Sequence, residues 1–173
     1  TTMKHTLLFL LMICACTLQA TATGKQPRLT DDELMTLVQK QTFRYFWDFA
    51  HPESGLARER SNDRLEIATI GGSGFGVMAI IVGVERGFIT REQGAERLLK
   101  IVEFLNKADS YHGIWAHWMD GATGKTIPFS RKDDGADLVE SAFMFEGLLA
   151  AHQYFTHDNP TENRIRGLIN TLW

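Results

Sequence analysis

Three acidic residues recur at every third position within the segment 130–151: Asp134, Asp137 and Glu140. At 100° per residue, this spacing places their carboxylates on one arc of a helix surface. Carboxyl groups gathered in this way can perform acid–base chemistry, in which one donates a proton while another activates water. The alternative is structural: Asp134 caps the helix and the other two favour its positive N-terminus. The spacing alone leaves both interpretations open.

The helix that would carry these carboxylates has the pattern of a buried helix. Between Ala142 and Ala151 only Glu146 is charged. A helix that is apolar on all sides usually lies inside a protein. Carboxylates at the start of such a helix are costly to bury unless they are paired or form a site.

An aromatic segment, residues 111–128, precedes this helix and lacks helical periodicity. Its two turn signals predict a hairpin or an extended loop. Trp115, His117 and Trp118 are its candidate substrate-binding residues, because aromatic rings commonly stack on the apolar faces of sugars. The alternative is that these rings pack the loop onto the helices. Beside paired carboxylates they favour glycosidic cleavage, in which one carboxyl protonates the leaving oxygen and another activates water or attacks the sugar.

The other elements are predicted to be helices that alternate between amphipathic and buried patterns. Amphipathic helices are expected at residues 30–50, 90–107 and 160–173, and a buried helix at 70–86. Thr30 with Glu33, and Thr90 with Gln93, match the capping box, while Pro160 suits a first helical position. This alternation predicts helical hairpins in two layers, with the buried helices on the inside.

Four glycines crowd the first half of the buried helix 70–86: Gly71, Gly72, Gly74 and Gly76. Glycine in a helix costs about 1 kcal/mol relative to alanine, so another group is expected to approach closely. The approaching group could belong to a functional site or to a neighbouring helix, and the sequence leaves both alternatives open. A dinucleotide-binding fingerprint over residues 74–79 is rejected, because no second βαβ unit follows it.

The composition limits the class of protein. The chain has 173 residues, of which 44% are hydrophobic and 23% charged, as in an ordinary single globular domain. The net charge of −3 provides no basic field, so no nucleic-acid partner is expected. No histidine pair has ligand spacing on one helix, so we expect no metal site, and no motif implies a cofactor.

Residues 1–22 have the features of a secretory signal peptide. A short basic start precedes an apolar run at residues 7–16, and Ala20-Thr21-Ala22 matches a cleavage site. Alternatively, the signal ends before Cys16, which would then carry a lipid anchor. The apolar run is too short to span a bilayer. We therefore expect an exported bacterial protein, periplasmic or attached to the outer membrane, with a linker at 23–29 and the folded domain at 30–173.

Several short motifs occur in the order typical of one known family. They are Phe46-Trp47, HPESGL (51–56), IGGSGFG (70–76), VERG (84–87), ITRE (89–92) and DLVE (137–140). In this order they resemble the glucoamylase-like proteins of Bacteroidetes, whose best-known activity is that of an endo-β-1,2-glucanase. The resemblance covers about residues 30–173. It implies an all-α fold, the (α/α)6 toroid, with a glycan-binding cleft at one end of the inner helices.

The resemblance also implies the roles of individual residues. Asp137 and Glu140, with Asp134 close by, match the acidic active-site motif of the family, and the aromatic loop around Trp115 and Trp118 would line the cleft. The expected activity is cleavage of a β-glucan, with a β-1,2-linked chain as substrate. The alternative is a non-catalytic glycan-binding lipoprotein of a sugar-uptake system.

One feature departs from the family pattern. A complete toroid needs about twelve helices, and this chain predicts about five of them. We therefore expect an incomplete toroid that exposes the open face of its buried helices, and whether this part alone is active stays open.

Overall fold

The computed structural model describes residues 28–62 and 64–173. They divide into two units, the first ending at Met35 and the second comprising Thr36–Trp173. The predicted signal peptide and the lipid anchor at Cys16 lie outside the described residues, so export stays a prediction. Within the described residues, we find no helix that is both long enough and apolar enough to cross a membrane.

Five helices and one small sheet make up the described part of the chain. The helices are α2 (Asp31–Trp47), α3 (Ile70–Glu85), α4 (Arg91–Leu105), α5 (Leu138–Tyr154) and α6 (Pro160–Leu172). The antiparallel sheet has the order β1 (Ile67–Thr69), β2 (Trp118–Asp120), β3 (Thr126–Ile127). The helices predicted from periodicity are confirmed to within a few residues, and β2 and β3 confirm the aromatic hairpin.

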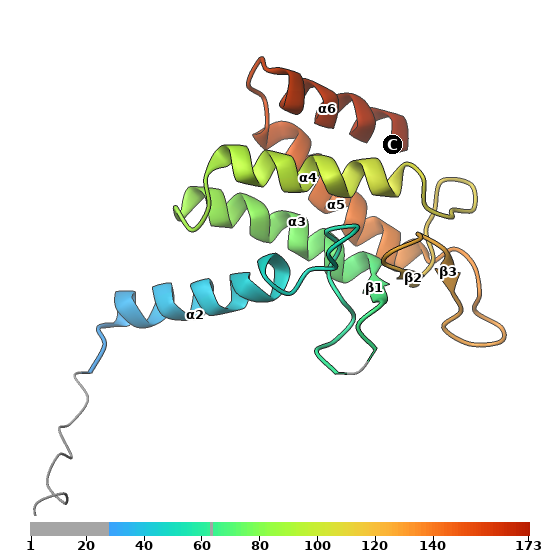
Figure 1. Ribbon diagram of the computed structural model, residues 1–173, viewed down its shortest axis with the longest axis horizontal. Coiled ribbons are helices and arrows are strands. Elements are labelled where there is room, and N and C mark those ends of the chain that lie inside the picture. The colour runs from blue at the N-terminus through green and yellow to red at the C-terminus, as the bar shows by residue number, and fades with distance from the viewer. Residues whose placement is uncertain (1–27, 63) are drawn as a thin grey trace, which may run out of the picture. The chain divides into compact units, whose positions relative to one another are not determined.

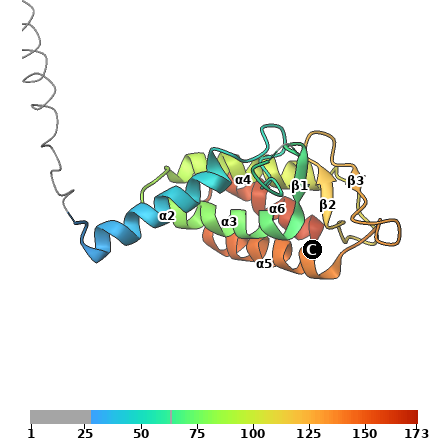
Figure 2. The same cartoon turned by 90° about the horizontal axis from the view of Figure 1, so that it is seen from below.

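The helices α3 to α6 form two layers (Figures 1 and 2). In one layer α3 packs along α5, in the other α4 packs along α6, and the layers meet where α3 contacts α4 and α5 contacts α6. Figure 1 shows that α3 and α5 both begin at the end of the molecule where the sheet lies. The N-termini of both inner helices are therefore brought to one place.

The hydrophobic core lies between these two layers. Each of the four helices α3 to α6 contributes side chains that are at most 2% exposed, including Ile80, Leu98, Leu148 and Ile165. Burying a side chain of this size contributes about 1.5–3 kcal/mol to stability. The alternating apolar patterns in the sequence are therefore satisfied by one shared core.

The glycines of α3 let α5 approach it closely. A β-carbon at Gly74 would lie 2.8 Å from the Cα atom of Met144 on α5. Conversely, a β-carbon at Gly147 of α5 would lie 2.5 Å from the carbonyl oxygen of Gly74. For Gly74 the neighbouring-helix alternative is therefore confirmed, because the two main chains leave no room for a side chain.

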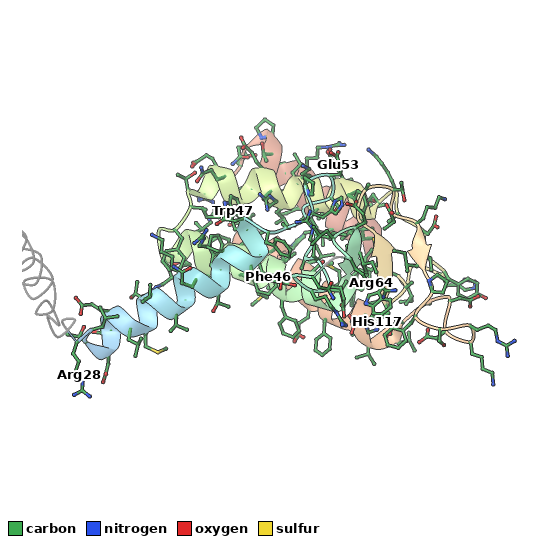
Figure 3. All side chains as sticks on the ribbon, turned by 60° about the horizontal axis from the view of Figure 1, so that its bottom comes forward. Arg28, Phe46, Trp47, Glu53, Arg64 and His117 are labelled. Atoms are coloured by element: carbon green, nitrogen blue, oxygen red, sulfur yellow. The ribbon has the colours of Figure 1, made fainter. Side chains whose placement is uncertain are left out.

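The second half of α2 packs on α3 through aromatic side chains. Figure 3 shows Phe46 between these two helices, and a β-carbon at Gly76 would lie 3.1 Å from its ring. Phe43 is 6% exposed and stacks on Trp47 with ring centroids 5.7 Å apart. The glycines of α3 therefore serve helix packing toward α2 as well as toward α5.

Part of the surface of α3 and α5 exposes large apolar side chains. They are Phe75, Met78, Val82, Val139, Phe143 and Leu149, each between 38% and 63% exposed. Phe75 and Phe143 are in contact across the two helices, with ring centroids 5.2 Å apart. We call these six residues the open face. It confirms the expectation that the inner helices are covered on one side only within this chain.

We expect the purified chain to self-associate through the open face, because large exposed apolar side chains on neighbouring helices favour burial against another surface. Introducing charge with Phe75→Glu and Phe143→Lys should shift sedimentation velocity profiles toward the monomer. Tyr111→Lys is the control, since Tyr111 is 66% exposed and lies on neither helix. A sharp monomeric peak for the unmodified chain, with cooperative unfolding, would contradict this expectation.

A buried ion pair fixes α6 to α4. Arg91 donates to both carboxylate oxygens of Glu162, at 2.9 and 2.8 Å, and Glu162 is only 2% exposed. The backbone N–H of His157 donates to the same carboxylate at 2.8 Å. Burial alone would raise the pKa of Glu162, but the hydrogen bonds from Arg91, His157 and Asn159 outweigh it and lower the pKa to about 2.

Glu162→Gln is therefore expected to lower the free energy of unfolding by about 3 kcal/mol near neutral pH. The pKa is about 2 in the folded chain against an ordinary 4.5, so this stabilisation is complete above pH 4.5 and is lost as the pH falls toward 2. Denaturant unfolding at several pH values should show the two proteins converging in acid. Glu103→Gln is the control, since its pair with Arg164 also joins α4 to α6 but is exposed and worth at most about 1 kcal/mol. Equal losses in the two variants would contradict the expectation.

Candidate active site

Asp137 and Glu140 both lie at the start of α5, and their carboxylates bind the N-termini of two neighbouring helices, α5 and α3. Asp137 is the N-cap of α5, and its Oδ1 atom accepts hydrogen bonds from the N–H groups of Val139 at 2.9 Å and Glu140 at 3.0 Å. Glu140 reaches across to α3, where its Oε2 atom accepts from the N–H of Gly71 at 2.7 Å and from the hydroxyl of Thr69 at 3.4 Å. Each carboxylate thus binds the first turn of a helix, where N–H groups are free and the dipole favours negative charge.

His117 lies between these two carboxylates. Its Nδ1 atom is 3.2 Å from Oδ2 of Asp137 and 3.9 Å from Oε1 of Glu140. The three side chains are between 18% and 25% exposed, so the cluster is largely enclosed yet open to solvent. In Figure 3, His117 lies beside the start of α5.

The segment 115–117 is held between the starts of α3 and α5. The N–H of Trp115 donates to the hydroxyl of Ser141 at 3.0 Å, and the N–H of Asp137 donates to the carbonyl of Trp115 at 2.8 Å. On the other side, the N–H of Ile70 donates to the carbonyl of His117 at 3.2 Å. The backbone that carries His117 is therefore fixed to both helices.

The prediction that Asp134 belongs to the helix is wrong. The helix α5 begins at Leu138, and Asp137 rather than Asp134 is its N-cap. Asp134 is exposed in the preceding loop, where it lines a separate cavity of about 520 Å³ together with Tyr111 and Thr126. The physical reason is that Asp137 has an extended backbone and already satisfies two N–H groups of the first turn.

The prediction that Trp115 presents its ring to a sugar is also wrong. Trp115 is 1% exposed, and its ring lies 5.0 Å from that of Phe145 within the core. Burying so large an apolar ring is strongly favourable, so the packing alternative applies to this residue. Trp118 is partly exposed and lies with its ring centroid 5.5 Å from that of His117.

Phe129 lies beside the candidate site, a position that the sequence analysis did not predict. Its side chain is 49% exposed, and its ring lies 4.6 Å from that of His117 and 4.7 Å from that of Trp118. We call these three rings the aromatic cluster. Phe129 lies outside the helical patterns of the sequence. Its position directly after Pro128, at the end of the aromatic segment, is the one signal that could have pointed to it. An exposed aromatic surface therefore does accompany the carboxylates, with Phe129 in the place expected for Trp115.

Asp137 is held in its ionised form. Burial alone would raise its pKa, but hydrogen bonds from the N–H of Glu140, the ring of His117 and the N–H of Val139 outweigh it and lower the pKa below its ordinary value. A carboxyl group with a lowered pKa is a poor proton donor near neutral pH, but it can act as a base or position water. In the part of the chain that the structure describes, no three His, Cys, Asp or Glu side chains are arranged to hold a metal ion.

Comparison with known proteins shows close relatives that are much longer than this chain. It is 53% identical over 146 residues to an "exo beta-1,2-glucooligosaccharide sophorohydrolase (non-reducing end)" of Parabacteroides distasonis, an alignment that covers 84% of this chain and 20% of the relative. No family model matches the chain.

Solved structures confirm the fold. A crystal structure named "a putative glucoamylase from Bacteroides uniformis" is 83% identical with a TM-score of 0.84, and the match covers 86% of this chain and 36% of that one. The endo-β-1,2-glucanase from Chitinophaga pinensis, in complex with sophorotriose and glucose, is 52% identical with a TM-score of 0.82, over 84% of this chain and 37% of that one. The chain thus spans between a fifth and somewhat more than a third of the length of these relatives.

These matches confirm the expected architecture, since the neighbours are glucoamylase-like toroids of which this chain covers only a fraction. At 52–83% identity over more than four fifths of its length, the chain is a relative of the glucoamylase-like proteins of Bacteroidetes and corresponds to one part of them.

Proposed function

We propose that the protein carrying this chain hydrolyses a β-glucan, with β-1,2-linked glucan as its substrate. The observation that carries the proposal is the meeting of two carboxylates, Asp137 and Glu140, at the N-termini of α3 and α5, with His117 between them. Glycoside hydrolysis needs a carboxylate that activates water or attacks the sugar, and either member of this pair could supply it. The names of the relatives, a sophorohydrolase and a β-1,2-glucanase, support the linkage.

The geometry suggests different tasks for different groups. Asp137 and Glu140 both accept hydrogen bonds from N–H groups, so both suit the positioning or activation of water. Hydrolysis also needs a carboxyl group that protonates the leaving oxygen. We assign that role to a carboxyl group outside this pair. The aromatic cluster with Phe129 provides an apolar surface on which a glucose ring stacks.

The natural full-length gene product tests the proposal. Incubated with β-1,2-, β-1,3- and β-1,4-linked glucans, it is expected to release sophoro-oligosaccharides from the first alone. The other glucans are matched controls, because they differ in linkage and not in the sugar. Binding of β-1,2-glucan without any hydrolysis would instead identify a glycan-binding lipoprotein. Release from a different glucan would contradict the proposed substrate.

We also propose that the protein is exported, on the evidence of the basic start, the apolar run and the cleavage pattern in residues 1–22. Mass spectrometry of the mature N-terminus distinguishes the two routes. A start after Ala22 indicates an ordinary signal peptide, and an acylated Cys16 indicates a lipoprotein. An intact N-terminus on cytoplasmic protein would contradict export.

A further inference from the structure

We propose that Gly71 is a positioning residue that seats the carboxylate of Glu140 on the first turn of α3. The role deepens the proposed function and rests on it, because it concerns a carboxylate of the same site. The N–H of Gly71 donates to Oε2 of Glu140 at 2.7 Å, and Gly71 itself is buried. The two residues come from different inner helices, so this hydrogen bond joins α3 to α5 at the end where the site lies.

The absence of a side chain at Gly71 is what admits the carboxylate. A β-carbon there would lie 2.5 Å from Oε2 of Glu140, 3.0 Å from Cδ and 3.3 Å from Oε1. An ordinary contact of a β-carbon is at least 3.4 Å, so Oε2, the oxygen that accepts the hydrogen bond, would have to move outward by about 1 Å and Cδ by about half of that. The hydrogen bond from the N–H would be broken by that movement.

Backbone conformation does not explain the glycine. Gly71 lies within α3, and its φ is not positive, unlike that of Gly55 or Gly87. Glycine is among the least favourable residues inside a helix. It also differs in function from Gly74, which makes room for the main chain of α5, whereas Gly71 makes room for a charged side chain.

The hydrogen bond from Gly71 determines which oxygen of Glu140 faces the site. Because Oε2 is bound by α3, Oε1 is the oxygen that lies on the side of His117, at 3.9 Å from its Nδ1 atom. Orientation of a reacting group at this level matters, since a displacement of about 1 Å can cost about 100-fold in rate. Gly71 thus acts through Glu140 and does not itself take part in the chemistry.

The first test is a thermal double-mutant cycle in the full-length protein and needs no activity. Gly71→Ala is expected to lower the Tm in the native background and to have no such effect once Glu140→Ala has removed the carboxylate. Gly167→Ala is the control, because a β-carbon at that helical position meets nothing within 4 Å. An equal fall in Tm for Gly71→Ala with and without the Glu140 carboxylate would overturn the proposal.

The second test separates positioning from folding by kinetics. In an active enzyme, Gly71→Ala is expected to lower kcat by about 100-fold with little change in KM, while Gly167→Ala leaves both unchanged. Unchanged kcat would overturn the positioning role. If the native protein hydrolyses no β-glucan, the proposed function fails, and the thermal cycle still decides whether Gly71 seats Glu140.

Discussion

Replacing Glu140 with glutamine is expected to lower the hydrolysis of β-1,2-glucan by about 10²–10⁴-fold, the usual contribution of an acid–base group. Glutamine has the shape of glutamate, and its amide oxygen can still accept a hydrogen bond from the N–H of Gly71. The substitution therefore removes the charge and the basicity while leaving the link between α3 and α5 in place. Release of sophoro-oligosaccharides by the full-length protein measures the loss.

Asp137→Asn removes the second carboxylate with equally little effect on the fold. Asparagine is as good an N-cap as aspartate, so the start of α5 is preserved while the negative charge facing His117 is lost. We expect a decrease in kcat similar to that of Glu140→Gln. Near-normal turnover in both variants would exclude this pair from catalysis.

Two further variants serve as controls for these substitutions. Glu146→Gln removes a carboxylate from the exposed part of the same helix, and Asp134→Asn removes one from the exposed loop before it. Both are expected to leave turnover within about twofold of the native value, because neither side chain forms a hydrogen bond or ion pair with His117, Asp137 or Glu140. A large loss with Asp134→Asn would restore the three-carboxylate site that the sequence spacing suggests.

Gly74→Ala is expected to destabilise the folded chain by about 3 kcal/mol or more. The new β-carbon would lie 2.5 Å from the carbonyl carbon of Phe143 and 2.8 Å from Cα of Met144. Both are main-chain atoms within α5, and a helix backbone cannot yield locally as a flexible side chain can. The two inner helices would have to separate along their contact, with loss of packing beyond the site of substitution.

Gly167→Ala in α6 is the matched control for Gly74→Ala. It is the same chemical change in a helix, but with nothing within 4 Å of the new β-carbon. The control is expected to raise the free energy of unfolding by up to about 1 kcal/mol, since alanine is the better helix former. Denaturant unfolding measures both variants. If Gly74→Ala were as stable as the native chain, or more stable, the contact between α3 and α5 would be looser than described.

Much of the fold could be predicted from local patterns. Thr30 and Glu33 form the expected reciprocal hydrogen bonds, at 2.8 and 3.3 Å, at the start of α2. Thr90 and Gln93 form the same capping box at the start of α4, and Pro160 occupies the first turn of α6. These features were predictable because a cap and the helix it starts lie within four residues of each other.

The predictions that failed depend on contacts between distant segments. The spacing of Asp134 suits a helix, but α5 begins later because the N–H of Asp137 pairs with the carbonyl of Trp115. Tryptophan often stacks on sugars, but Trp115 is buried because its segment is held between the starts of two helices. The strand β1 forms because residues 67–69 pair with residues 118–120. Residues 67–69 are too few to show an alternation of apolar and polar side chains.

The sequence by itself determined the five helices and the capping boxes that begin α2 and α4, because amphipathic periodicity and capping are local properties of the chain. The resemblance of its short motifs to a known family, rather than periodicity, pointed to Asp137 and Glu140. Only the tertiary structure decided that Glu140 binds the N-terminus of α3, that His117 lies between the carboxylates and that Phe129 is the exposed ring. The hydrogen bond between Gly71 and Glu140 joins residues 69 positions apart. No local pattern records such a contact, since it exists only after the two inner helices have packed with their N-termini together.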